Sequence, residues 1–230
     1  DNISALNSTK RLIKIAREVK RNIHILHISS GDELKLIAKN KDLVSAEVTP
    51  QHLFFNSPDC YDNLGTLAQM NPPIRGKKHQ DNLWKAIKNN IVDIIGSDHA
   101  PHTLEEKKRK YPNSPSGMTG VQTLVPILLD FVNKDKLSIF DLVKFTSTNP
   151  SRYFKIKDKG LIKVGYDADF TIVDLNKTRI IENNWIASKA GWTPYNGLKV
   201  KGWPILTIIN GKVIMRDDQV LGKPEGKKFI

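Results

Sequence analysis

The sequence has 230 residues, 39% apolar and 26% charged, and no apolar run of about 18 residues that would span a membrane, which predicts a globular protein with no membrane partner. Its formal net charge of +12 comes mostly from lysines interleaved with acidic residues, as in Glu105-Glu-Lys-Lys-Arg-Lys110, so we expect a solvated lysine-rich surface and no nucleic-acid partner. Cys60 is the only cysteine, which excludes an intrachain disulfide and is typical of a reducing cytoplasm.

The chain opens on a helical pattern rather than on a methionine. After Asp1, the apolar residues Leu12, Ile13, Ala16 and Val19 recur at helical spacing, with lysines and arginines between them. Such a beginning is typical of the middle of a protein. We therefore expect the sequence to be a later part of a longer chain.

Three short apolar runs predict strands that end near His27, Thr49 and Asp98. Helix signals follow the first run at Gly31-Asp-Glu-Leu-Lys-Leu-Ile-Ala, where the acids lie in the first turn, and precede the third run at Asp81-Asn-Leu-Trp-Lys-Ala-Ile-Lys. Strands that alternate with helices indicate βα units and a parallel sheet.

The third predicted strand ends in groups that can do chemistry. The segment Val92-Asp-Ile-Ile-Gly-Ser-Asp-His-Ala-Pro-His102 passes from an apolar run directly to a carboxylate and two imidazoles. A (β/α) barrel places its metal ligands and acid–base groups at the C-terminal ends of its strands. We therefore expect a site here, against the plainer alternative of a strand followed by a polar loop.

The last part of the chain has a different pattern of predicted elements. A long apolar helix is predicted from Gly120, with a kink at Pro126, and a capping box at Ser138-Ile-Phe-Asp141 predicts the next helix. One more short helix is predicted over Asn149-Pro-Ser-Arg-Tyr-Phe154, and Asn210-Gly211 predicts a type I′ hairpin. We expect a barrel segment over 1–156 and a small β-sandwich segment over 157–230.

The strand count limits what this chain forms by itself. A (β/α)8 barrel takes about 250 residues, whereas only the first 156 belong to the predicted barrel segment. Three strands cannot close a barrel, so we expect five further strands upstream of Asp1.

Four motifs in order resemble the dihydroorotases of the cyclic amidohydrolase superfamily. They are Leu26-His-Ile-Ser29, Glu47-Val-Thr-Pro-Gln-His-Leu53, Met70-Asn-Pro-Pro-Ile-Arg75 and Gly96-Ser-Asp-His-Ala-Pro-His102. The resemblance extends over essentially the whole chain and includes the later Gly165-Tyr-Asp-Ala-Asp-Phe-Thr-Ile-Val-Asp174. It implies an α/β fold, the C-terminal part of a (β/α)8 TIM-type barrel followed by a small β-sandwich unit.

The resemblance implies one or two zinc ions, with His27 and Asp98 among the ligands. His24, earlier on the same strand, is the competing histidine. Asp98 would also take a proton as water attacks the ring amide and pass that proton to the departing nitrogen. The family's His-x-His-x-Arg motif is missing, so most of the metal ligands and the arginine for the substrate carboxylate are expected upstream, and the fragment alone is expected to be inactive.

The same resemblance implies substrate contacts at Asn71, His102, Ser116 and Gly117. Asn71 could equally be a turn residue, and His102 a surface group. We expect His99 to shape the loop rather than bind metal. Gln51 stands where many relatives have histidine, and we interpret it as a lineage variant of structural importance.

The implied activity is the reversible interconversion of N-carbamoyl-L-aspartate and dihydroorotate in pyrimidine biosynthesis. We expect a cytoplasmic enzyme and a homodimer. The alternatives are another cyclic amidohydrolase, such as an allantoinase or a dihydropyrimidinase, or a non-catalytic scaffold that partners aspartate carbamoyltransferase. A nucleic-acid-binding module is the remaining alternative.

Overall fold

A parallel sheet organises the first part of the chain in the computed structural model, which describes residues 1–223. Its strands are β1 (Ile23–Ile25), β2 (Val44–Val48) and β3 (Ile94–Ile95), hydrogen-bonded in the order β1-β2-β3. Both pairings are parallel, because each strand returns through a helical connection. The three predicted strands and their parallel arrangement are therefore confirmed.

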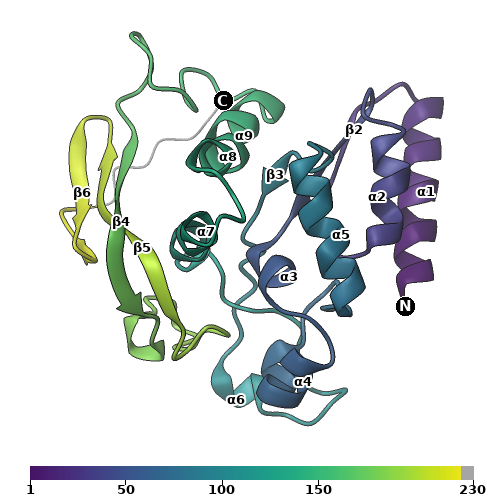
Figure 1. The fold of residues 1–230 in the computed structure, drawn as a ribbon, viewed down its shortest axis with the longest axis horizontal. Helices are drawn as coiled ribbons and strands as arrows, with labels where there is room; N and C mark the ends of the chain where they lie inside the picture. The colour runs from purple at the N-terminus through teal and green to yellow at the C-terminus, as the bar shows by residue number, and fades with distance from the viewer. Residues whose placement is uncertain (224–230) are drawn as a thin grey trace. The chain divides into compact units, whose positions relative to one another are not determined.

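Helices connect and cover these strands (Figure 1). In chain order they are α1 (Asn2–Glu18), α2 (Gly31–Ala38), α3 (Pro50–Phe54), α4 (Asp59–Leu64), the 3-10 helix η1 (Gly65–Ala68), α5 (Lys77–Lys88) and α6 (Leu104–Lys107). The side chains of Ser30 and Thr49 cap α2 and α3 by accepting hydrogen bonds from backbone amides. Each cap starts a helix within a few residues of a strand end, so the strand ends are held in place.

The chain divides into two compact units whose bounds differ from the predicted segments 1–156 and 157–230. The first unit contains residues 1–124 and 182–196, and the second contains residues 125–181 and the chain from 197. The segment 182–196, with the 3-10 helix η3 (Asn183–Trp185), returns to the first unit, and its aromatic side chains Trp192 and Tyr195 are buried.

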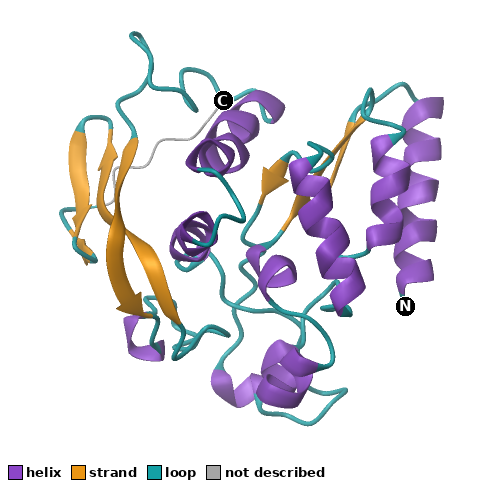
Figure 2. Ribbon diagram, viewed as in Figure 1, coloured by secondary structure: helices purple, strands orange, loops and turns teal. Residues whose placement is uncertain are grey.

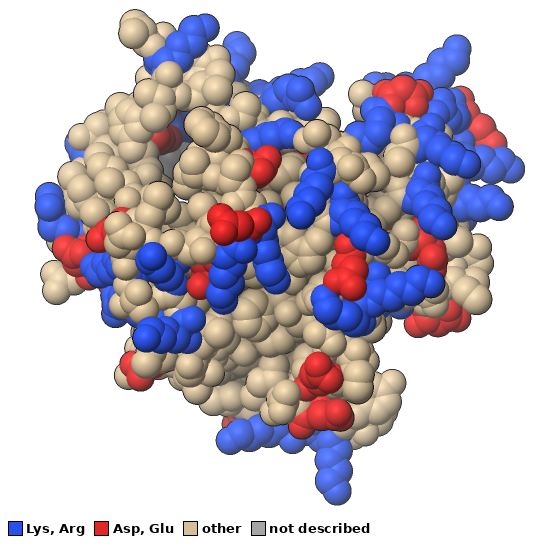
Figure 3. Space-filling view, viewed as in Figure 1, with Lys and Arg blue, Asp and Glu red and all other residues tan. Residues whose placement is uncertain are grey.

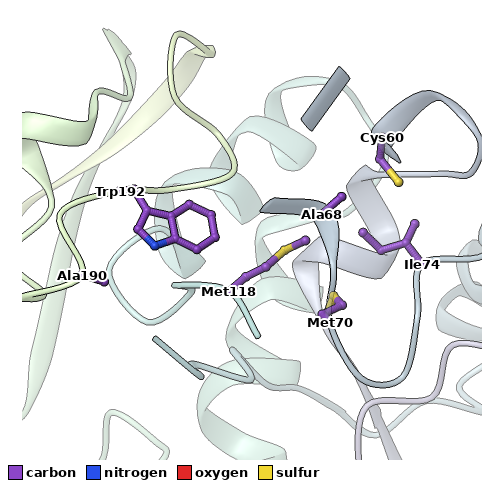
Figure 4. Packing of buried hydrophobic residues seen from close by; sticks show 7 residues of the cluster. All are labelled: Cys60, Ala68, Met70, Ile74, Met118, Ala190 and Trp192. Carbon is purple, nitrogen blue, oxygen red and sulfur yellow. The ribbon is translucent and has the colours of Figure 1, made fainter. Parts of the chain in front are cut away.

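Trp192 is the main anchor of that returning segment. It belongs to a buried cluster of the first unit made of Cys60, Ala68, Met70, Ile74, Met118, Ala190 and Trp192. Figure 4 shows the Met118 side chain in the middle of this cluster, with Trp192 and Ala190 on one side of it. The indole Nε1 also donates a hydrogen bond of 2.7 Å to the carbonyl of His102. Burial and this bond together hold the segment against the loops that follow β3.

The second unit combines helices with an antiparallel sheet (Figure 2). Its elements are α7 (Leu124–Asn133), α8 (Ile139–Val143), the π-helix η2 (Lys144–Thr148), α9 (Asn149–Tyr153), β4 (Phe170–Ile180), β5 (Lys199–Ile209), β6 (Lys212–Arg216) and β7 (Gln219–Val220). The sheet order is β4-β5-β6-β7, and Asn210 and Gly211 turn between β5 and β6 with φ values of 49° and 76°. The predicted hairpin, the capping box at Ser138 and the helix at Asn149 are confirmed.

One expectation for this unit is wrong, and another is not tested. Helix α7 begins at Leu124, so Pro126 lies in its first turn, where an amide has no acceptor within the helix, and the predicted kink at Pro126 is wrong. Within the described residues the strands form one four-stranded sheet, so the second layer of the expected sandwich stays a prediction.

Basic and acidic side chains are interspersed on one face of the molecule (Figure 3). On the face shown in Figure 3, lysine and arginine side chains recur across the molecule with acidic side chains among them. The expectation of a solvated lysine run at 105–110 is wrong at one position, because the Lys107 side chain is completely buried. No helix within residues 1–223 has the length and apolarity needed to cross a membrane.

Candidate functional site

The ends of β1 and β3 carry the two residues expected to bind metal. His27 follows β1 and Asp98 follows β3, and both are partly buried. Both also have left-handed backbones, with φ values of 37° and 43°. Residues other than glycine adopt this conformation at a cost, and such residues cluster at functional sites. The strained positions therefore coincide with the chemistry-bearing side chains at one edge of the sheet.

Asp98 lies in a mixed electrostatic environment. Burial raises the pKa of its carboxyl, His27 opposes that rise, and Glu47 adds to it. His27, after β1, and Glu47, on β2, are therefore both within electrostatic reach of Asp98. A carboxyl with a raised pKa holds a proton more readily, which suits a group that accepts and returns one.

Glu47 is a member of this site that the sequence interpretation did not single out. It lies on β2, and its carboxylate approaches His24 Nε2 at 3.3 Å, with both side chains largely buried. His24 Nδ1 also lies 2.8 Å from the Ser45 hydroxyl, so this histidine is already engaged. A Cβ added at Gly96 would lie 2.8 Å from Glu47 Oε1, so glycine leaves room for the carboxylate. A glutamate within an apolar strand was the signal that could have indicated it.

His52 joins the end of β2 to the segment that contains Asn71. Its Nε2 donates to the carbonyl of Pro72 at 2.9 Å, and its Nδ1 lies 2.8 Å from the hydroxyl of Thr49. Burial lowers the pKa of His52 to about 4. The hydrogen bond to the Pro72 carbonyl opposes this shift, whereas the charges of His27 and Arg75 contribute to it. The imidazole is therefore neutral at physiological pH and acts as a fixed link between the two segments.

Arg75 connects the same segment to β1. Its Nε donates a hydrogen bond of 3.0 Å to the hydroxyl of Ser29, two residues after His27. Asn71 itself is exposed, and it lies between the anchored residues Gln69 and Pro72. The structure therefore presents Asn71 at the surface on a segment that is fixed on both sides.

The other three predicted substrate residues lie together. His102 Nε2 is 3.2 Å from the carbonyl of Ser116, and the Gly117 amide donates to the carbonyl of Gln69 at 2.9 Å. Gly117 has φ 140°, and a Cβ there would lie 2.4 Å from the carbonyl oxygen of Ala100. Only glycine permits this approach of two backbones, so it brings the 114–118 loop against the loop after β3.

His99 and Gln51 fix the loop on which Asp98 lies. The amide of Gly120 donates to His99 Nδ1 at 3.1 Å, as expected for a histidine that shapes the loop. Gln51 Nε2 donates to the carbonyl of Ser97 at 3.0 Å. Asp98 is thus flanked on both sides by anchored residues.

The donor set of this chain fits part of a metal site. Among residues 1–223, no three His, Cys, Asp or Glu side chains are grouped closely enough to hold a metal ion. His27 and Asp98 offer an imidazole nitrogen and a carboxylate oxygen, both of which zinc accepts, and zinc takes four ligands in most proteins. These two residues fit a zinc site to which other residues contribute.

Comparison with known sequences gives a consistent assignment. A model described as the amidohydrolase family matches residues 7–214. The dihydroorotase of Pyrococcus abyssi is 43% identical over 229 residues, which is 99% of this chain and 54% of that protein. The dihydroorotase of Methanosphaera stadtmanae is 39% identical over 223 residues, which is 95% of this chain and 50% of that protein. The chain spans about half the length of the curated relatives it matches.

Two solved structures of similar fold carry the names hydantoinase or dihydropyrimidinase. An L-hydantoinase (dihydropyrimidinase) from Arthrobacter aurescens superposes with a TM-score of 0.93 at 29% identity, covering 97% of this chain and 51% of that one. A dihydropyrimidinase from Brevibacillus agri gives a TM-score of 0.88 at 29% identity, covering 94% of this chain and 50% of that one. The resemblance read from the motifs is confirmed, as is an α/β fold of amidohydrolase type.

Proposed function

Because the chain belongs to the amidohydrolase family, we propose that the full-length protein containing it is a dihydroorotase, which interconverts N-carbamoyl-L-aspartate and dihydroorotate. The observation that carries the proposal is the identity of 39–43% with two dihydroorotases over 95–99% of the chain. The reaction opens or closes one ring amide. It needs a proton acceptor beside the attacked carbonyl and contacts that orient the ring.

Asp98 is the proton carrier in this proposal. Burial raises the pKa of its carboxyl, and the link between Gln51 and Ser97 holds the residue before it. The carboxylate accepts a proton from the attacking water, and the carboxylic acid then returns it to the nitrogen released from the ring. In the direction of ring closure, the same carboxylate accepts the proton from the attacking nitrogen, and the carboxylic acid then returns it to the departing water.

Asn71, His102, Ser116 and Gly117 orient the substrate in this proposal. The Asn71 amide suits the ring amide, which offers both a donor and an acceptor. His102 faces the substrate carboxylate, and the backbone at Ser116 and Gly117 meets the pyrimidine ring. The hydrogen bonds among Gln69, His102 and the 114–118 loop support this assignment, since they bring three of the four residues into one place.

Zinc is the proposed cofactor, held in part by His27 and Asp98. A bound zinc ion supplies Lewis-acid activation of the carbonyl and of the attacking water. The remaining ligands and the arginine for the substrate carboxylate come from outside this chain. We further propose that the enzyme is cytoplasmic, in keeping with a single cysteine that is buried, and that it forms a homodimer, as the resemblance implies.

A dihydropyrimidinase is the second candidate, because the solved structures of similar fold carry that name. Its substrates lack the carboxylate that His102 would face. A scaffold that partners aspartate carbamoyltransferase is the non-catalytic alternative, and the presence of both His27 and Asp98 favours catalysis over it.

The proposal is tested with the purified full-length protein. Dihydroorotate hydrolysis is measured directly, after removal of metal by a chelator, and after zinc is restored. We expect turnover that is lost with the metal and regained with zinc. Absence of turnover by the zinc-loaded, folded protein would reject the proposal, and it would favour the scaffold.

A further inference from the structure

Lys107 is a completely buried lysine that has no acidic partner in the described part of the chain. It ends α6, and its exposed fraction is 0%. Its ammonium donates to two main-chain carbonyls, that of Gln69 at 2.8 Å and that of Pro115 at 2.9 Å. Among residues 1–223 no carboxylate lies within ion-pair distance of it.

Burying this ammonium costs free energy that an apolar side chain would not cost, so the charge calls for an explanation. An ion taken out of water loses several kcal/mol of hydration unless hydrogen bonds replace it. Two carbonyls and the ring of Trp192, 5.8 Å from Nζ to the ring centroid, provide partial replacement. Burial accordingly lowers the pKa of Lys107 to about 8. A methionine of similar length would fill the same space without this cost.

The two carbonyls belong to the segments that carry the proposed substrate residues. Gln69 precedes Asn71 by two positions, and Pro115 directly precedes Ser116. The side chain of Gln69 makes a second connection, because its Nε2 donates to the carbonyl of Ser114 at 2.8 Å and to the Ser116 hydroxyl at 3.3 Å.

The backbone of Lys107 is tied to the same place. The hydroxyls of Thr66 and Ser114 donate to its carbonyl at 2.5 and 3.1 Å. The backbone and the ammonium of Lys107 are therefore both hydrogen-bonded to the 114–118 loop. The ammonium joins that loop to the Gln69–Asn71 segment, in addition to the direct hydrogen bond of 2.9 Å from the Gly117 amide to the Gln69 carbonyl.

We propose that Lys107, together with Gln69, is a positioning pair that sets the gap between Asn71 and the Ser116–Gly117 backbone, and hence the fit of the substrate ring. The inference rests on the proposed function. It assigns no chemical step to Lys107, because the ammonium is occupied by backbone carbonyls. Its loss should weaken substrate binding and leave the proton transfers at Asp98 largely intact.

The test uses the full-length protein with Lys107→Met, and with Lys108→Met as the control because Lys108 is exposed one residue further on. For Lys107→Met we expect KM for dihydroorotate to rise about 10-fold while kcat stays within about 3-fold of the parent. We also expect faster amide exchange in segment 114–118. Lys108→Met should match the parent in all three measurements.

Unchanged KM in a folded Lys107→Met protein, or a loss confined to kcat, would overturn the inference. Should that variant fail to fold, Gln69→Ala decides by the same two criteria, since it removes the second connection without disturbing a buried charge. An inactive parent protein would reject the proposed function instead. The exchange rate of segment 114–118 would then test the structural link by itself.

Discussion

The side chain of Gln51, at the start of α3, donates a hydrogen bond of 3.0 Å to the carbonyl of Ser97, the residue before Asp98. Gly120 makes room for this bond, since a Cβ there would lie 2.7 Å from Gln51 Nε2 and 2.4 Å from the Ser97 oxygen. The end of β2 thereby helps to hold the loop that presents Asp98. Gln51 is fully buried, so its polarity can be tested by substitution.

Gln51→Glu should destabilise the full-length protein by about 3 kcal/mol at pH 8, because it buries a carboxylate opposite a carbonyl oxygen. Burial raises the folded pKa of the new carboxyl above its unfolded value, so the deficit should shrink as the pH is lowered to 5. Urea unfolding at the two pH values measures this. The exposed control Gln219→Glu should change stability by less than about 0.5 kcal/mol. A pH-independent deficit would contradict the assigned hydrogen bond.

His52 should make stability depend on pH. Its pKa is about 4 in the folded protein, below the ordinary 6.5, because burial disfavours the charged ring. As the pH falls, the unfolded chain therefore takes up the proton at a higher pH than the folded protein does. The contribution of neutral His52 to the free energy of unfolding is complete above pH 6.5 and is lost as the pH falls towards 4. The loss should reach about 3 kcal/mol. Titration of the His52 ring by NMR measures the pKa directly, and a value near 6.5 would contradict this.

Asp98→Asn should lower kcat by about 10²- to 10⁴-fold, because it removes the proton carrier, which is also one of the proposed zinc ligands. The fold should survive, since asparagine tolerates the left-handed backbone of φ 43°. Asp98→Ala should remove activity equally and cost about 1–2 kcal/mol more stability. Steady-state rates and thermal unfolding of both variants separate the two effects. Substantial activity in folded Asp98→Asn protein would refute the assignment.

Gly117→Ala should destabilise the protein by about 2 to 5 kcal/mol and raise KM, because its Cβ would collide with the Ala100 carbonyl. Gly76→Ala is the matched control, since a Cβ there meets the Ser57 oxygen only at 3.9 Å and the backbone has φ −62°. The control should cost less than about 1 kcal/mol. Similar unfolding midpoints for the two variants would show that the close approach is absent.

Much of the site was predictable from local pattern. Strands rich in β-branched residues, each followed by a capped helix, place His27 and Asp98 at the same edge of a parallel sheet. The motifs that resemble dihydroorotases then identify Asn71, His102 and Gly117 as residues of one region. Periodicity and spacing are sufficient to find the strand ends, whereas the roles of Asn71, His102 and Gly117 come only from the resemblance.

Other features depend on partners far along the chain. The charged run around Lys107 reads as a solvated surface, and only the carbonyls of Gln69 and Pro115 explain its burial. Segment 182–196 belongs to the first unit through Trp192, which no local pattern indicates. The kink at Pro126 was wrongly predicted because the sequence alone does not show that its helix begins at Leu124.

The most direct test of the account compares two substrates in the zinc-loaded full-length protein. Dihydroorotate and dihydrouracil share the ring amide, and only dihydroorotate carries the carboxylate that His102 is proposed to face. We predict that kcat/KM for dihydroorotate exceeds that for dihydrouracil by at least about 100-fold, because a site built for a polar group rejects the analogue that lacks it. Equal values, or a preference for dihydrouracil, would contradict the account and assign the protein to the dihydropyrimidinases.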